Sequence, residues 1–222
     1  MNKLFYGDNL EVLRKYIKDE SIDLCYIDPP FNSKRNYNQI YNNIGQEDRA
    51  QAQAFTDTWT WDEVANRGFI IENERNEFTP QSILLISGLK EVLGKGGLLA
   101  YLVSMTLRIA EIHRVLKPTG SFYFHCDPTA SHYLKLVLDA IFCSKGGDFK
   151  NEIIWHYSGW NKVLKSHFER RHDVILFYSK SLNPYFNTYC EPYESKEEYL
   201  KIRKQKLYKD EDGKEYTLDT RD

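Results

Sequence analysis

The chain has 222 residues, which is enough for one large domain or for one domain and part of another. Hydrophobic residues make up 41% of the sequence and charged residues 28%, a composition typical of a soluble globular protein. The net charge of −2 at pH 7 gives no overall electrostatic basis for binding nucleic acid, so any DNA-binding surface must come from local basic clusters.

The four cysteines indicate a reduced protein without a metal site. No two of them form a CxxC pair, and none has a metal-ligand spacing to a histidine. We therefore predict a cytosolic protein. The N-terminus lacks the apolar core of a signal peptide, and no apolar run approaches the roughly 20 residues that cross a bilayer. These features predict no membrane partner.

The chain is predicted to begin with a short strand, a helix and a buried strand. Leu4–Tyr6 is the first strand, and Asp8 begins the helix, with Glu11 placed as in a capping box. Three apolar residues recur at helical spacing after it: Leu10, Leu13 and Ile17. The apolar run Ile22–Ile27 is the buried strand. It stops at Asp28-Pro29-Pro30, because two prolines cannot continue a central strand.

Residues 32–78 are polar and irregular, and we predict that they form one long loop. A loop of this length in a compact domain is usually functional or mobile. Because it follows Asp28-Pro29-Pro30 directly, it is predicted to be an active-site loop.

Two helices and a strand are predicted next. Thr79-Pro80 begins a helix, and Gly94–Gly97 interrupts the pattern. Six apolar residues then step by four and three, which predicts an amphipathic helix: Leu98, Leu102, Met105, Ile109, Ile112 and Leu116. Lys117–Gly120 ends this helix, and Ser121–Cys126 is predicted to be a buried strand that stops at Asp127-Pro128.

The remaining elements are a helix and two strands. The helix carries four apolar residues on one face: Tyr133, Val137, Leu138 and Ile141. Asn151–Tyr157 and Asp173–Tyr178 are the strands, and a polar loop of the length of a lid or binding loop joins them. From Ser179 the chain is polar and charged with no clear core pattern, and Lys201–Lys209 is predicted to be a helix with a solvated basic face.

This order of elements predicts an α/β protein with a doubly wound, mostly parallel sheet. Such folds bind ligands at the carboxyl ends of their strands. Three acidic residues lie at or just past the ends of predicted strands: Asp8, Asp28 and Asp127. We therefore expect a site that contains them.

The segment Asp28-Pro29-Pro30-Phe31 carries the groups that methylation of an exocyclic amine requires. The amine is a poor nucleophile because its lone pair is delocalised into the base. A carboxylate and a backbone carbonyl that accept both N–H groups localise that lone pair, and proline suits the carbonyl position because its φ is fixed. An aromatic ring can stack on a base that has left the duplex. The alternative is a plain turn, with Phe31 packed in the core.

Several longer stretches accompany this tetrapeptide: GDNL at 7–10, AFTDTWTWDE at 54–63, HRVLKPTGSFYFHCDPTASHYLKLVLDAIF at 113–142, NEIIWHY at 151–157 and HDVILFYSKS at 172–181. Together they resemble the site-specific adenine DNA methyltransferases of bacterial restriction-modification systems. The resemblance covers about residues 1–185. It implies a Rossmann-like fold and transfer of a methyl group from S-adenosyl-L-methionine to the N6 amino group of adenine in double-stranded DNA.

The resemblance also implies which part of such an enzyme this sequence contains. The catalytic motif comes first, as in the permuted group called beta, which carries a Phe-x-Gly-x-Gly cofactor loop near its C-terminus. This sequence reaches Asp222 without that loop, so we expect a fold and a cofactor site that are incomplete at the C-terminal part. Residues 1–185 would be the catalytic part, and residues 186–222 the start of the target-recognition region or a disordered tail. Two alternatives stay open: a cytosine N4 methyltransferase and a truncated, non-catalytic DNA-binding remnant.

Specific roles follow from the resemblance. Asp28, Pro29, Pro30 and Phe31 would be catalytic, and Asp28 and Pro29 would also contact the cofactor. Asp8 would accept a hydrogen bond from the amino group of the cofactor's adenine, whereas the simpler interpretation is a helix N-cap worth roughly 1 kcal/mol.

Further predictions concern residues at strand ends and in loops. His125 and Asp127 would line the base pocket, or Asp127 would cap the helix begun by Pro128. Basic residues are predicted to contact DNA phosphates: Lys34, Arg35, Lys162, Lys165, Arg170 and Arg171. Trp160 and His167 lie beside them in the sequence. An ordinary solvated loop is the alternative. A homodimer or a restriction-modification partner subunit is the further expectation.

Overall fold

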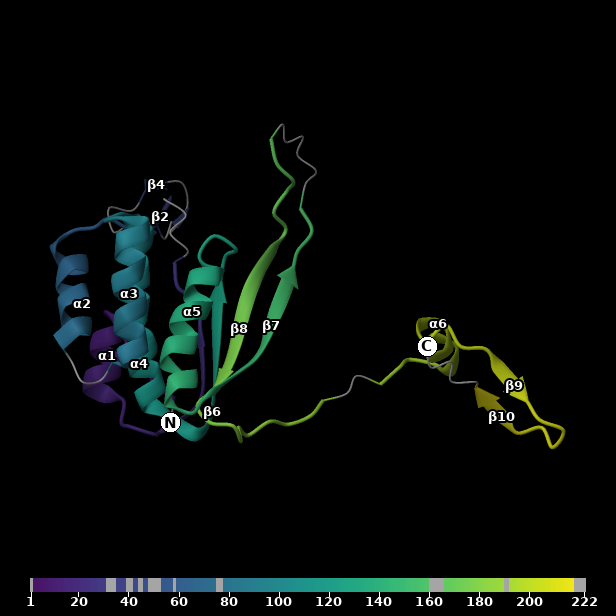
Figure 1. The fold of residues 1–222 in the computed structure, drawn as a ribbon. Helices are drawn as coiled ribbons and strands as arrows, with labels where there is room; N and C mark the ends of the chain where they lie inside the picture. Colours follow the sequence, from purple (N-terminus) through teal and green to yellow (C-terminus); the bar gives the residue numbers. More distant parts are fainter. Residues whose placement is uncertain are drawn as a thin grey trace. The chain divides into compact units, whose positions relative to one another are not determined.

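The computed structural model describes residues 2–30, 35–38, 42–43, 46–47, 53–57, 59–74, 78–159, 166–189 and 192–217. The chain divides into two compact units, Met1–Tyr185 and Phe186–Asp222. Both are drawn in Figure 1.

The first unit is built on a four-stranded sheet with the order β1-β6-β8-β7. Its strands are β1 (Ile22–Ile27), β6 (Leu116–Cys126), β7 (Asp148–His156) and β8 (His172–Ser179). β1 pairs with β6 in parallel, and β8 pairs antiparallel with both β6 and β7. Three strands therefore run in one direction and β8 runs in the other, so the sheet is mixed.

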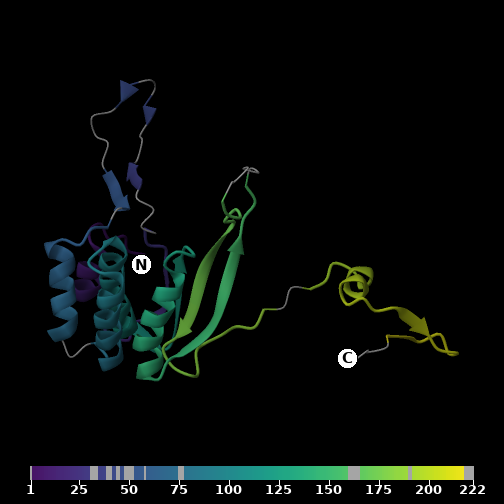
Figure 2. The ribbon, with the colours of Figure 1, turned by 45° about the horizontal axis from the view of Figure 1, so that its top comes forward.

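The helices of this unit pack together on one side of the sheet, where α4 contacts α1, α2, α3 and α5 (Figures 1 and 2). They are α1 (Asn9–Tyr16), α2 (Glu63–Glu74), α3 (Pro80–Leu93), α4 (Gly97–Val115) and α5 (Ser131–Ile141), followed by a 3-10 turn at Cys143–Lys145. The α/β class is confirmed. A doubly wound fold also needs helices on the second face of the sheet, and the described residues provide none there.

The sequence also predicts that the sheet is mostly parallel. The strands β1, β6 and β7 are parallel to one another, as expected, but only one of the three hydrogen-bonded pairings is parallel. The reason is that β7 and β8 are consecutive strands joined by one connection, which returns the chain antiparallel into the space between β6 and β7.

The core lies between the sheet and the helices, and α4 lies at the centre of this core. Alternate residues of the two central strands point into it and are almost fully buried: Phe122, Phe124 and Cys126 on β6, and Val174, Leu176 and Tyr178 on β8. The helix predicted from Leu98 onward is α4, and most of its residues are buried. α3 begins as predicted, with Thr79 as N-cap and Pro80 in the first turn.

Four predictions about elements are wrong. Leu4–Tyr6 is not a strand, and Leu4 and Tyr6 are fully exposed. β1 is a strand but is not buried, because only one of its edges is paired among the described residues, and Leu24 is 56% exposed. Residues 32–78 are not one loop, since they contain α2 and short strands. β6 begins at Leu116, directly after α4.

The short strands within residues 32–78 form two antiparallel pairs. β2 (Arg35–Asn38) pairs with β5 (Gln53–Asp57), and β3 (Asn42–Asn43) pairs with β4 (Gln46–Glu47). In both ribbon views these short strands lie at the end of the unit where β7 finishes and β8 begins (Figures 1 and 2). That is the end at which β1, β6 and β7 finish.

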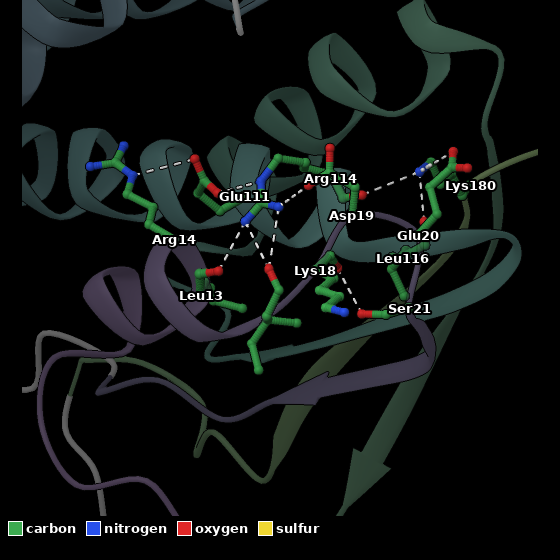
Figure 3. Close-up of polar contacts among 11 residues, drawn as sticks. Leu13, Arg14, Lys18, Asp19, Glu20, Ser21, Glu111, Arg114, Leu116 and Lys180 are labelled. Carbon is green, nitrogen blue, oxygen red and sulfur yellow. Dashed lines mark hydrogen bonds and ion pairs between the residues drawn. The ribbon is translucent and has the colours of Figure 1, made fainter.

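A polar network fixes the connection from α1 to β1 against α4 and β6 (Figure 3). Arg114 on α4 donates to the carboxylate of Glu111 at 2.8 Å and to the carbonyl of Leu13 at 2.9 Å. Glu111 is 5% exposed and also pairs with Arg14 at 3.3 Å. Lys180, just past β8, donates to the carbonyl of Leu116 at 2.6 Å and to Glu20 at 3.2 Å. The α1–β1 segment is thereby anchored at its start and its end.

The second unit contains α6 (Lys196–Ile202) and an antiparallel pair, β9 (Leu207–Lys209) and β10 (Glu215–Thr217). The predicted helix over Lys201–Lys209 is wrong, because α6 ends at Ile202 and β9 follows. The tight turn between β9 and β10 places Gly213 at φ +79°, which favours glycine. Among the described residues of the chain, no helix has the length and apolar composition needed to cross a membrane.

Candidate active site

Asp28-Pro29-Pro30 lies at the carboxyl end of β1, where the sequence predicted a turn. The Asp28 side chain is 58% exposed, so its carboxylate is open to a ligand on one side. Phe31 lies outside the described residues, and its stacking on a base stays a prediction.

A cleft of about 720 Å³ extends from this motif. Its walls come from α1, β1 and α4, together with Trp59. Most of the wall is apolar, and the polar side chains that reach it include those of Asp8, Asp28 and Arg108. A volume of this size, with apolar walls and a few convergent polar groups, is typical of a small-molecule site.

Asp8 is the N-cap of α1, as the simpler interpretation predicted. Its Oδ1 accepts from the backbone N–H of Leu10 at 2.8 Å and of Glu11 at 3.4 Å. Its Oδ2 accepts from Nη2 of Arg108 at 2.7 Å. Oδ2 accepts one hydrogen bond and keeps a second lone pair, so the cap leaves the predicted contact with a cofactor chemically open.

Arg108 is a cleft residue that the sequence did not point to. It lies on α4, donates to Asn9 Oδ1 at 2.7 Å and to Ser104 Oγ at 2.6 Å, and pairs with Asp8. Burial lowers the pKa of Arg108, and the carboxylate of Asp8 opposes that shift. The visible signal in the sequence was an arginine among the apolar residues of this helix, which does not by itself indicate a ligand site.

His125, near the carboxyl end of β6, contacts the catalytic motif. Its Nδ1 is 3.2 Å from Oδ1 of Asp28 and 3.2 Å from the hydroxyl of Tyr26. Its Nε2 is 3.4 Å from Oδ2 of Asp173, the second residue of β8. The imidazole is stacked on the ring of Trp155 on β7, with centroids 5.7 Å apart and planes 7° apart. The residue is 8% exposed.

Two residues of β1 next to the motif, Cys25 and Tyr26, have shifted pKa values. Burial and the nearby charge of Asp28 raise the pKa of Tyr26, which keeps its hydroxyl protonated. Burial raises the pKa of Cys25, in the wall of the cleft, to about 11, so this thiol is not a nucleophile at neutral pH. Within the part of the chain that the structure describes, no group of His, Cys, Asp and Glu is arranged to hold a metal ion.

Asp127 does not join this cluster in the way that His125 does. Its carboxylate accepts from the backbone N–H groups of Thr129 and Ala130, both at 3.2 Å. It therefore stabilises the turn that precedes α5, which begins at Ser131 rather than at Pro128.

The predicted DNA-contacting residues are only partly described. Lys34, Lys162 and Lys165 lie outside the described residues, and of Arg35 only the backbone in β2 is described. Arg170 donates to the Thr129 hydroxyl at 3.4 Å, and Arg171 pairs with Glu169 at 2.5 Å. Contact with DNA stays a prediction for all six residues.

Comparison with known proteins assigns a class of activity to this geometry. Residues 22–219 match the family of N6/N4-type DNA methylases. The chain is 29% identical over 184 residues to the Mod subunit of the type III restriction-modification enzyme StyLTI of Salmonella typhimurium strain LT2, covering 81% of the chain and 24% of that relative. It is 25% identical over 182 residues to the DNA adenine methyltransferase YhdJ of Escherichia coli strain K12, covering 82% of the chain and 42% of that relative. The chain thus spans less than half the length of either relative.

Proposed function

The chain belongs to the N6/N4 DNA methylase family, and we propose that it transfers a methyl group from S-adenosylmethionine to the N6 amino group of adenine in double-stranded DNA. One observation carries the proposal. Asp28-Pro29-Pro30 lies at the carboxyl end of β1, in the wall of a cleft of about 720 Å³ that also contains Asp8. Ligands of α/β proteins bind at such strand ends.

In the proposed mechanism, Asp28 and the carbonyl of Pro29 each accept one N–H of the target amine. These two hydrogen bonds draw the nitrogen towards tetrahedral geometry and localise its lone pair. Asp28 need not be a strong base, because the amine loses a proton only as its bond to the methyl carbon forms. Positioning and stabilisation of the developing positive charge therefore dominate. Phe31 is proposed to stack on the extruded base.

The residues of the cleft fit S-adenosylmethionine. Apolar walls suit a purine ring, and the carboxylates of Asp8 and Asp28 suit an amino group and a sulfonium cation. We propose that Asp8, Asp28 and Pro29 contact it, Asp8 with the second lone pair of its Oδ2. When bound, S-adenosylmethionine supplies an electrophilic methyl group.

Adenine is the proposed target rather than cytosine. The name of the Escherichia coli relative, a DNA adenine methyltransferase, supports this choice. So does the aspartate at the first position of the motif, whose adenine preference comes from the family resemblance. The name of the Salmonella relative, a Mod subunit, supports a restriction-modification partner.

Three further proposals concern the fold, the second unit and the contacts with DNA. The first unit is proposed to be part of a Rossmann-like methyltransferase fold. The second unit, Phe186–Asp222, is proposed to begin the target-recognition region, and the six basic residues named above are proposed to contact DNA phosphates.

The direct test is methyl transfer from labelled S-adenosylmethionine to DNA by the purified protein, followed by digestion and mass spectrometry of the nucleosides. We expect N6-methyladenine as the product. Asp28→Asn should lower kcat on the order of 10²- to 10³-fold, because the carboxylate acts on charge that develops in the transition state.

Asp23→Asn is the matched control, since Asp23 lies on the same strand and pairs with Lys117 at the surface. This variant should retain the activity of the wild type. N4-methylcytosine as the product would show that cytosine, and not adenine, is the target base. A fully active Asp28→Asn variant would contradict the proposed mechanism.

A further inference from the structure

A row of four side chains, one from each strand or its end, crosses the face of the sheet on which the described residues provide no helix. Asp28 follows β1, His125 is on β6, Asp173 is on β8 and Trp155 is on β7. The sheet register explains the row, since His125 pairs with Ile175 and Trp155 pairs with Asp173 across neighbouring strands. The row is therefore set by backbone pairing and not by flexible side chains.

The imidazole of His125 is held on three sides. Its ring face stacks on Trp155, its Nε2 edge lies 3.4 Å from the Asp173 carboxylate, and its Nδ1 edge lies 3.2 Å from Asp28. With only 8% of the residue exposed, the ring has little freedom to turn. It meets Asp28 from the protein side, while 58% of the Asp28 side chain remains open for a ligand.

A carboxylate with that exposure would otherwise be free to change its rotamer. Fixing it before the base arrives lowers the entropic cost of reaching the reactive geometry. With a proton on each ring nitrogen, His125 donates from Nδ1 to one oxygen of Asp28 and from Nε2 to Asp173, and the other oxygen of Asp28 is then left to accept from the target amine.

We infer that His125 is a positioning residue for the methyl-transfer reaction: its Nδ1–H orients the Asp28 carboxylate towards the target amine, and Trp155 and Asp173 hold its ring. This inference rests on the proposed function and adds a residue that touches neither the base nor the methyl donor.

The experiment uses two substitutions, each of which keeps an N–H group near the place of one of the two imidazole nitrogens. The amide nitrogen of an asparagine lies near the place of Nδ1, and that of a glutamine lies near the place of Nε2. His125→Asn therefore keeps the donor to Asp28, whereas His125→Gln keeps only the side that faces Asp173. We expect His125→Asn to stay within a few-fold of wild-type kcat. We expect His125→Gln and His125→Ala to lose on the order of 10- to 100-fold in kcat, with the KM for DNA and for S-adenosylmethionine little changed.

His113→Asn is the matched control, because His113 is also 8% exposed but packs against Phe142 in the core. It should change thermal stability and leave kcat unchanged at temperatures where the variant is folded. Circular dichroism melting of every variant separates loss of fold from loss of positioning. If the His125 variants do not fold, Asp173→Asn decides, with a fall in kcat at constant KM supporting the inference and a wild-type kcat overturning it.

The outcomes also separate this inference from the function on which it depends. Inactive wild-type protein, or an active Asp28→Asn variant, would contradict the proposed function itself. An inactive Asp28→Asn variant beside a folded His125→Ala variant with wild-type kcat would overturn the role of His125 alone. Equal activity of His125→Gln and His125→Asn would overturn it too.

Discussion

Some side chains of this protein both stabilise the fold and line the cleft. Asp8 caps α1 with one carboxylate oxygen and pairs with Arg108 through the other, and both residues line the cleft. A change at Asp8 will therefore alter stability and binding at once. Effects on activity alone cannot assign such a residue to catalysis.

His113 is a residue whose burial makes stability depend on pH. Its pKa is lowered from 6.5 to about 4, by burial first and then by the charges of Lys145 and Lys180. Above pH 6.5 the imidazole is neutral in both the folded and the unfolded chain. As the pH falls from 6.5 to about 4, the unfolded chain binds a proton that the folded chain does not, so stability is lost in this window.

The expected loss is at most about 3 kcal/mol in the free energy of unfolding. Urea unfolding of His113→Asn between pH 7.5 and 4.5 should show a shallower acid limb than the wild type. His132→Asn changes an exposed histidine and should keep the wild-type limb. Parallel limbs for His113→Asn and wild type would contradict the buried, neutral state of His113.

The sequence reveals contiguous site residues far better than dispersed ones. Asp28-Pro29-Pro30 could be found because strand, turn and chemistry lie in one short segment. Asp173 and Trp155 could not, because their contact with His125 depends on strand pairing between distant segments. Nothing local in their sequence distinguishes them from ordinary strand residues.

At the scale of elements, α1 depends on α4 for its position. Arg114 donates to the carbonyl oxygen of Leu13 in the last turn of α1, and it compensates the buried charge of Glu111. These bonds replace the C-cap that α1 lacks, because Ile17 follows it in an extended conformation.

Arg114→Gln should lower the free energy of unfolding by about 3 kcal/mol, because it leaves the Glu111 carboxylate buried with a weaker partner. The double variant Glu111→Gln/Arg114→Gln should be more stable than Arg114→Gln, since the uncompensated charge is removed. Lys117→Gln breaks an exposed pair with Asp23 and should stay within about 0.5 kcal/mol of wild type. Chemical denaturation of the four proteins measures these differences, and a double variant less stable than the single one would contradict the argument.

The elements that sequence patterns missed have identifiable physical reasons. β6 was predicted to begin at Ser121 because Pro118 and Gly120 read as a helix stop. In the structure, the pairing with β1 shifts register between Ile22 and Leu24, and pairing with β8 begins only at Ser121. Pro118 therefore lies where the strand needs no N–H donor, which is where a strand tolerates proline.

At the scale of the whole molecule, the two units are connected by the segment of residues 180–195, whose described parts, 180–189 and 192–195, lie in no helix or strand. Three aromatic residues within it are exposed, namely Tyr185 at 79%, Phe186 at 63% and Tyr189 at 79%. The aromatic residues of the first unit's core are almost fully buried. The connection should therefore be more accessible to a protease than the core of the first unit.

Limited digestion with chymotrypsin should cut near Tyr185–Tyr189 before it cuts within the β1-β6-β8-β7 sheet. Mass spectrometry of the fragments over time measures the order of cleavage. Earlier cleavage at Phe122 or Phe124 of β6 would contradict the compactness of the first unit.

The parallel pairing of β1 with β6 has a consequence for how the protein folds. It closes a chain segment that contains α2, α3 and α4, so it is a non-local contact, whereas the β7–β8 ribbon is local. Local contacts form earlier, since less chain entropy is lost in making them. Asp28 meets His125 only when this distant pairing is complete. We therefore expect nascent and partly folded chains to be catalytically inactive. Activity should appear only in the last cooperative step of folding.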